Sequence, residues 1–134
     1  MDSYSRIREL RNLPARGLQR WVNATRYSWQ GLRSAVKHEE AFRQETIALF
    51  IGLPAALWIA TTLWQAAILI ASLLLIMVVE MINSALEALV DRVSTEFHEL
   101  SGRTKDMGSA AVLLTIFIAM VVWGAAIWQK WLAG

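Results

Sequence analysis

Two long stretches of this chain carry no charged side chain. From Thr46 to Val79, 34 consecutive residues include no Asp, Glu, Lys or Arg, and the stretch from Met107 to Gln129 adds 23 more. About 20 apolar residues cross the hydrocarbon core of a bilayer, so the two stretches have room for roughly three spans. A chain of 134 residues with this pattern predicts one small membrane domain. It excludes a soluble monomer and a receptor with a large extracellular domain.

The pattern predicts an all-α membrane protein with an N-terminal surface helix and three transmembrane helices. We expect a basic amphipathic region over residues 1–37 and transmembrane helices over residues 44–61, 65–92 and 105–129. The first 45 residues scatter Arg, Glu and Pro and have no apolar segment of the signal-peptide type, so no cleavable signal is expected. The absence of cysteine excludes disulfides and thiolate chemistry.

The predicted N-terminal helix has the composition of a helix that lies on an anionic membrane surface. Trp21, Trp29 and Leu32 recur at roughly helical spacing, and arginines fill the positions between them. The alternative is a bundle helix that packs on other protein.

The distribution of positive charge predicts the orientation in the membrane. With the N-terminus in the cytoplasm, three spans place residues 1–45 and 92–106 inside, with 12 of the 13 Lys and Arg residues, and leave only Lys130 outside. The C-terminus is then on the opposite side. The chemically useful polar residues therefore all lie at the cytoplasmic face.

One stripe of the second predicted span carries polar residues. Glu80, Asn83, Glu87 and Asp91 share one side of a helix at 3.6 residues per turn. Glu80 directly follows the apolar run, and an ionisable group at membrane depth costs on the order of 3 kcal/mol, which marks a functional position. Glu80 and Glu87 together suit a divalent cation or proton transfer. Asp91 is interpreted as an ordinary solvated carboxylate.

Two further clusters flank the spans. Glu39 and Arg43 are i, i+4 neighbours where the chain enters the first span, and Lys105 shares a face with Ser109 where the last span begins. Gly102 is expected to break the polar connection before that span. Carboxylates and a lysine at one membrane level are the groups that Mg²⁺-dependent phosphate chemistry uses. No Walker A sequence and no protein-kinase glycine loop accompanies them.

At these residues the sequence resembles the prokaryotic diacylglycerol kinase family, which are small integral-membrane lipid kinases. The resemblance covers roughly residues 20–128 and is carried by the stretches YSWQGLR, EAFRQE, VEMINSALEALVDR and EFHELSGRTKDMGSAAVL. It implies a homotrimer in the bacterial inner membrane that phosphorylates diacylglycerol with Mg-ATP to give phosphatidic acid. Active sites are then shared between neighbouring subunits.

The resemblance also implies roles for individual residues. Glu80 matches the general base, and Glu39 and Glu87 match the glutamates that bind Mg²⁺. The positions that match ATP contacts are Arg20, Tyr27, Glu39, Glu87, Glu96, His98, Lys105 and Asp106. The positions that match lipid contacts are Arg43, Glu45, Glu80, Asn83 and Ser109.

Two other functions remain open. An undecaprenol kinase would have the same fold and nucleotide chemistry, although the EAFRQE and HELSGR stretches look more like the diacylglycerol type. A small ion- or proton-coupled transporter would use Glu80 and Glu87 within the membrane. The clustering of polar residues at one face speaks against a transport path across the bilayer.

Overall fold

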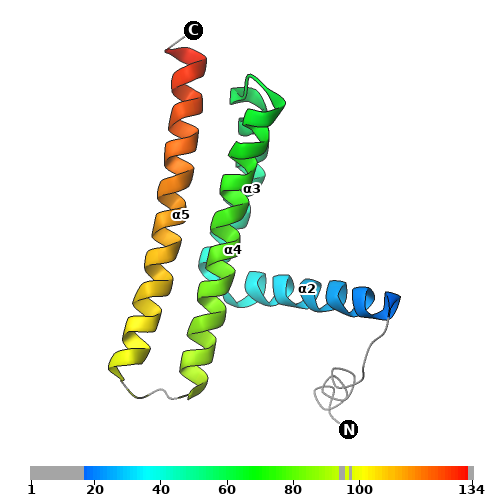
Figure 1. The fold of residues 1–134 in the computed structure, drawn as a ribbon, viewed down its shortest axis with the longest axis vertical. Helices are drawn as coiled ribbons and strands as arrows, with labels where there is room; N and C mark the ends of the chain where they lie inside the picture. Colours follow the sequence, from blue (N-terminus) through cyan, green and yellow to red (C-terminus); the bar gives the residue numbers. More distant parts are fainter. Residues whose placement is uncertain (1–16, 94–95, 97, 133–134) are drawn as a thin grey trace. The chain divides into compact units, whose positions relative to one another are not determined.

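The regular structure of the chain is helical. The computed structural model describes residues 17–93, 96 and 98–132, and every regular element within them is an α-helix (Figure 1). These elements are α2 (Leu18–His38), α3 (Glu40–Ile59), α4 (Leu63–Val93) and α5 (Glu99–Trp131). The prediction of an all-α protein is confirmed.

Helix α2 corresponds to the N-terminal helix predicted in the basic amphipathic region. Its tryptophans, Trp21 and Trp29, are 75% and 67% exposed, and Ala35 is its only buried side chain. The residues before Gly17 in the predicted 1–37 region lie outside the described residues.

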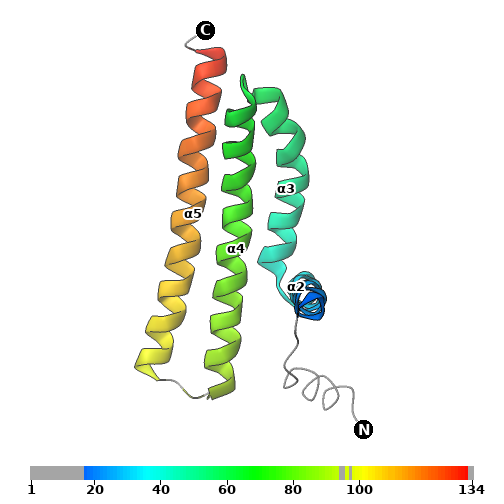
Figure 2. The ribbon, with the colours of Figure 1, turned by 45° about the vertical axis from the view of Figure 1, so that its right-hand side comes forward.

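Helices α3, α4 and α5 form an up-down-up arrangement in which α4 lies between the other two (Figure 2). The small buried side chains of Ala56 and Ala126 cluster with Ile59 and with Leu69, which is fully buried, near the turn that joins α3 to α4. Small residues let helix backbones approach closely, which is the usual way that helices pack in membranes. Further along, Trp123 Nε1 of α5 donates a hydrogen bond to Ser72 Oγ of α4 at 3.2 Å.

Most of the apolar surface of the bundle faces outward. Of the described helices, α4 and α5 are long and apolar enough to cross a membrane, with only 22% and 17% of their apolar windows buried. Helix α3 spends its first six residues, which include Arg43 and Glu45, on a polar entry, and only residues 46–59 follow as an apolar stretch. The first predicted span, residues 44–61, therefore stays a prediction. The exposed apolar surface needs lipid or neighbouring subunits to cover it.

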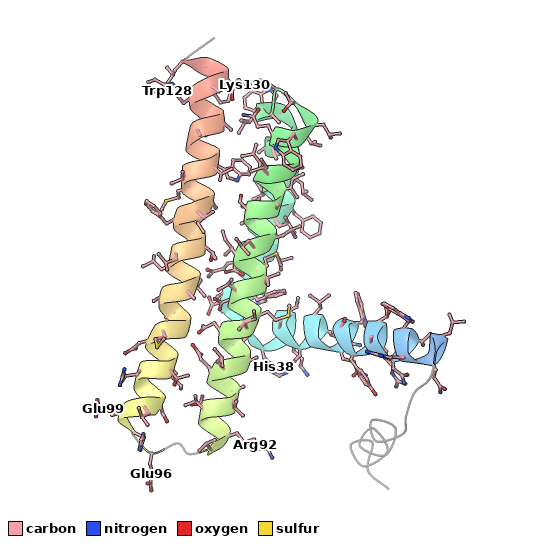
Figure 3. All side chains as sticks on the ribbon, in the orientation of Figure 1. His38, Arg92, Glu96, Glu99, Trp128 and Lys130 are labelled. Carbon is pink, nitrogen blue, oxygen red and sulfur yellow. The ribbon has the colours of Figure 1, made fainter. Side chains whose placement is uncertain are left out.

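The two ends of the bundle differ in chemistry (Figure 3). At the turn between α3 and α4, Thr62 Oγ1 accepts from the backbone N–H of Gln65, and Gln65 Nε2 donates to Gln129 on α5. Lys130 Nζ donates to the carbonyl of Trp58 at the same end. Arg92 and Glu99 lie at the opposite end (Figure 3). The polar stripe of α4, from Glu80 to Asp91, runs toward this end.

The expected break at Gly102 is wrong. Helix α5 begins at Glu99 and runs through Gly102, whose backbone N–H donates to the carbonyl of His98 at 3.0 Å. The ring of His98 caps the helix, because its Nδ1 accepts from the backbone N–H of Leu100 at 3.2 Å. A capped first turn makes the helix tolerant of one glycine.

Candidate functional site

Two members of the polar stripe of α4 are buried in the bundle. Glu80 and Asn83 are each only 8% exposed. Glu80 lies 17 residues after Leu63 in a continuous helix, which is about 26 Å at 1.5 Å per residue. That distance approaches the hydrocarbon thickness of roughly 30 Å. Glu80 thus lies where an apolar helix reaches a polar boundary.

A hydrogen bond joins the next two members of the stripe. Asn83 Nδ2 donates to Glu87 Oε1 at 3.1 Å, one helical turn further along. Asn83 Oδ1 is buried and has no hydrogen-bond partner among the described residues. The side chains therefore share one face of α4, as the spacing in the sequence predicts.

An open pocket of about 560 Å³ lies beside this stripe. Glu80, Asn83 and Glu87 line it from α4, and Ser109 lines it from α5. Ile116 lines both this pocket and an apolar groove of about 500 Å³, which contains Ile76 of α4 and Trp123 of α5. The pocket that holds these polar side chains therefore borders an apolar groove at Ile116, an arrangement that suits an amphipathic ligand.

Two carboxylates outside α4 also interact with Glu80. Glu45 of α3 and Glu39 each interact electrostatically with Glu80, as Glu87 does. Glu39 occupies the N-cap position of α3, but its side chain makes no capping hydrogen bond. Its carboxylate is therefore not committed to the end of the helix.

A lysine reaches the stripe from α5. Lys105 Nζ lies 2.6 Å from Asp91 Oδ1, and Lys105 also interacts electrostatically with Glu87. Asp91 is 58% exposed, as expected of a solvated carboxylate, but it is also paired with this lysine, which the sequence pattern did not predict. Its only signal in the sequence was its place as the fourth polar residue of the α4 stripe, since nothing there identified Lys105 as its partner.

Other predicted site residues have structural contacts in the described part of the chain. Arg43 Nη1 donates to the carbonyls of Val36 and Lys37, at 3.2 and 3.4 Å. These carbonyls belong to the last turn of α2, where a cation is favourable. His98 caps α5, and Asp106 is exposed on that helix.

Three of the predicted site residues are described only by themselves. Arg20 and Tyr27 lie on the part of α2 before Ala35, which belongs to a different unit of the chain from the pocket, so they are described only as exposed residues of α2. Glu96 is exposed in the connection between α4 and α5.

Glu39 and Glu87 could bind Mg²⁺ only together with other ligands. Among the described residues, no group of three or more Asp, Glu and His side chains gathers as a complete metal site. Mg²⁺ in kinases is held by one or two carboxylates together with substrate phosphates and water. Glu39 and Glu87 are of the right type and number for such a shared site.

Comparison with known proteins identifies the family. The family model described as prokaryotic diacylglycerol kinase matches residues 26–127. The chain belongs to this family. A protein of Escherichia coli strain K12 called diacylglycerol kinase is 48% identical over 113 residues, which cover 84% of this chain and 93% of the relative. Proteins with the same name from Haemophilus influenzae and Pseudomonas aeruginosa are 47% and 44% identical, over 81% and 80% of this chain and 92% and 87% of their own lengths.

The range matched by the prokaryotic diacylglycerol kinase model includes the whole stripe of α4 and the pocket beside it. It also includes Glu39 and Lys105, and Tyr27 lies at its edge. Arg20 lies outside the matched range.

Proposed function

We propose that the chain is an ATP-dependent diacylglycerol kinase that makes phosphatidic acid at the cytoplasmic face of the membrane. Membership of the prokaryotic diacylglycerol kinase family makes it a membrane lipid kinase. The observation that carries the assignment is the position of Glu80, which lies buried beside a pocket that also holds Asn83, Glu87 and Ser109 and that borders an apolar groove at Ile116. A lipid with a hydroxyl group at its polar end fits this arrangement.

Glu80 is the proposed general base. The hydroxyl oxygen of diacylglycerol forms a bond to the γ-phosphorus of ATP, and the bond from that phosphorus to the β,γ-bridging oxygen breaks. The hydroxyl proton passes to the carboxylate of Glu80, and ADP leaves with the bridging oxygen. Glu80 is buried among helices and lines the pocket in which the lipid hydroxyl is proposed to bind.

Glu39 and Glu87 are the proposed ligands of Mg²⁺. Bound Mg²⁺ would neutralise charge on the phosphates of ATP. Lys105, held by Asp91, adds a positive charge close to Glu87. The remaining ATP contacts carried over from the family are Arg20, Tyr27, Glu96, His98 and Asp106. They are proposals that rest on the sequence match.

The lipid is proposed to lie along α4 and α5. Its hydroxyl reaches Glu80, while Ser109 and Asn83 line the same pocket and offer polar contacts. An acyl chain follows the apolar groove past Ile116 toward Trp123. Arg43 and Glu45 complete the set of lipid positions carried over from the family.

The proposed assembly is a homotrimer in the bacterial inner membrane, with α3, α4 and α5 as the three spans of each subunit. The N-terminus is then cytoplasmic and the C-terminus lies on the opposite side. The open pocket at Glu80 and the large exposed apolar surface support a site that a neighbouring subunit completes.

Phosphate transfer from labelled ATP in mixed micelles tests the proposed function. Diacylglycerol and undecaprenol are offered separately and then together to the purified full chain. We expect labelled phosphatidic acid to be the main product in competition. Preferred labelling of undecaprenol would contradict the substrate, and labelling of neither lipid would contradict the kinase assignment.

A further inference from the structure

Gly108 of α5 packs directly against a side chain of the candidate site. The residue is buried, and a Cβ atom added to it would overlap Asn83 Oδ1 and lie 3.2 Å from Asn83 Cγ. By contrast, an added Cβ at Gly102 or Gly124 of the same helix would have no neighbour within 4 Å. Among these three glycines of α5, only Gly108 leaves space that a polar site residue occupies.

The amide of Asn83 uses that space in a defined orientation. Its Nδ2 donates to Glu87 Oε1 at 3.1 Å, which is the only direction possible because a carboxylate accepts and does not donate. Its Oδ1 faces Gly108. The amide group is planar and rigid, so a push on Oδ1 also moves Nδ2.

We propose that Gly108 is a positioning residue for Glu87. Its missing Cβ lets the Asn83 amide lie between α4 and α5 with its donor on Glu87, and this hydrogen bond sets the direction of the Glu87 carboxylate. The inference rests on the proposed function, because it takes Glu87 to be a ligand of Mg²⁺ bound with ATP. Hydrogen bonds to metal-ligating carboxylates tune metal affinity in this way.

Gly108→Ala tests the proposal without relying on turnover. The readout is the Mg²⁺ concentration that half-saturates binding of a non-hydrolysable ATP analogue to the assembled protein in detergent, measured by calorimetry. We expect this concentration to rise roughly tenfold, the effect of losing a partner that orients a ligand. Gly124→Ala is the matched control on the same helix and should leave it unchanged. An unchanged Mg²⁺ dependence in Gly108→Ala would overturn the proposal.

A double-mutant comparison asks whether Gly108 acts through Asn83. In an Asn83→Ala background, adding Gly108→Ala should cause no further rise in the Mg²⁺ requirement, because the overlapping amide is gone. An additive rise would refute a path through Asn83. If Gly108→Ala alone does not assemble, the double variant Asn83→Ser with Gly108→Ala should assemble, because serine is shorter than asparagine. Its Mg²⁺ requirement should equal that of the single variant Asn83→Ser. Failure of that pair to assemble would also overturn the proposal.

The result separates this inference from the proposed function. If Glu87→Gln raises the Mg²⁺ requirement and Gly108→Ala does not, then the role of Gly108 is wrong and the metal site stands. If Glu87→Gln has no effect on Mg²⁺ binding, the proposed metal ligand is wrong, and the inference about Gly108 falls with it.

Discussion

Lys105 of α5 and Asp91 of α4 are paired across the connection between the two helices, with Nζ of the lysine 2.6 Å from Oδ1 of the aspartate. Both side chains are partly exposed, at 39% and 58%, so water screens the attraction and little stability comes from it. The pair instead fixes where the ammonium group of Lys105 lies relative to Glu87. We therefore expect loss of this ion pair to affect nucleotide binding more than stability.

Asp91→Asn removes the carboxylate charge and keeps the shape of the side chain. We expect the KM for ATP to rise several-fold, because Lys105 loses the partner that holds it near Glu87 in the proposed nucleotide site, while kcat changes less. The melting temperature in detergent should stay close to that of the wild type. Steady-state kinetics at saturating diacylglycerol measures KM for ATP and kcat separately. Asp91→Glu keeps the charge and should recover most of the affinity, whereas a wild-type KM in Asp91→Asn would refute the positioning of Lys105.

Glu39→Gln and Glu87→Gln test the proposed metal ligands. Each should raise the Mg²⁺ concentration needed for half-maximal activity at least about tenfold, because a neutral amide is a poor ligand for this cation. Glu40→Gln is the matched control, since Glu40 is exposed and its Oε1 accepts from Gln44 instead. An Mg²⁺ titration for all three variants gives the comparison. The same Mg²⁺ requirement in the three would contradict the assignment of Glu39 and Glu87.

Ala55→Phe fills the apolar groove from α3. We expect kcat/KM to fall for long-chain diacylglycerol by roughly tenfold more than for a short-chain form, because a filled apolar site discriminates by chain length. Leu57→Phe adds bulk on the same helix at a position that is 65% exposed and outside the groove. Assays with the two lipids in mixed micelles measure the ratio. Equal losses for both chain lengths would exclude the groove as the acyl-chain site.

Periodicity within one helix predicted part of the site. Glu80, Asn83 and Glu87 share a face because 3.6 residues make a turn, and the hydrogen bond from Asn83 to Glu87 confirms that face. The position of Glu80 at the end of an uncharged run predicted that it would be an unusual carboxylate, and its burial agrees.

Relations between helices could not be predicted in this way. The pairing of Lys105 with Asp91 depends on how α5 is rotated and shifted against α4, and the periodicity of either helix alone leaves both free. The contact of Gly108 with Asn83 depends on the same two quantities. The continuation of α5 through Gly102 was missed because capping by His98 is a local hydrogen bond that the sequence pattern did not reveal.

Glu80→Gln tests the central claim most directly, because it changes one oxygen to an amide nitrogen and removes the base with little change of shape. The measurement is the rate of phosphate transfer from labelled ATP to diacylglycerol in mixed micelles, with ATP binding and melting temperature recorded on the same preparation. We expect kcat to fall roughly 10²- to 10⁴-fold, the contribution of a general base, while ATP binding and melting temperature stay near the wild-type values. A turnover close to that of the wild type would contradict the role of Glu80 as the base.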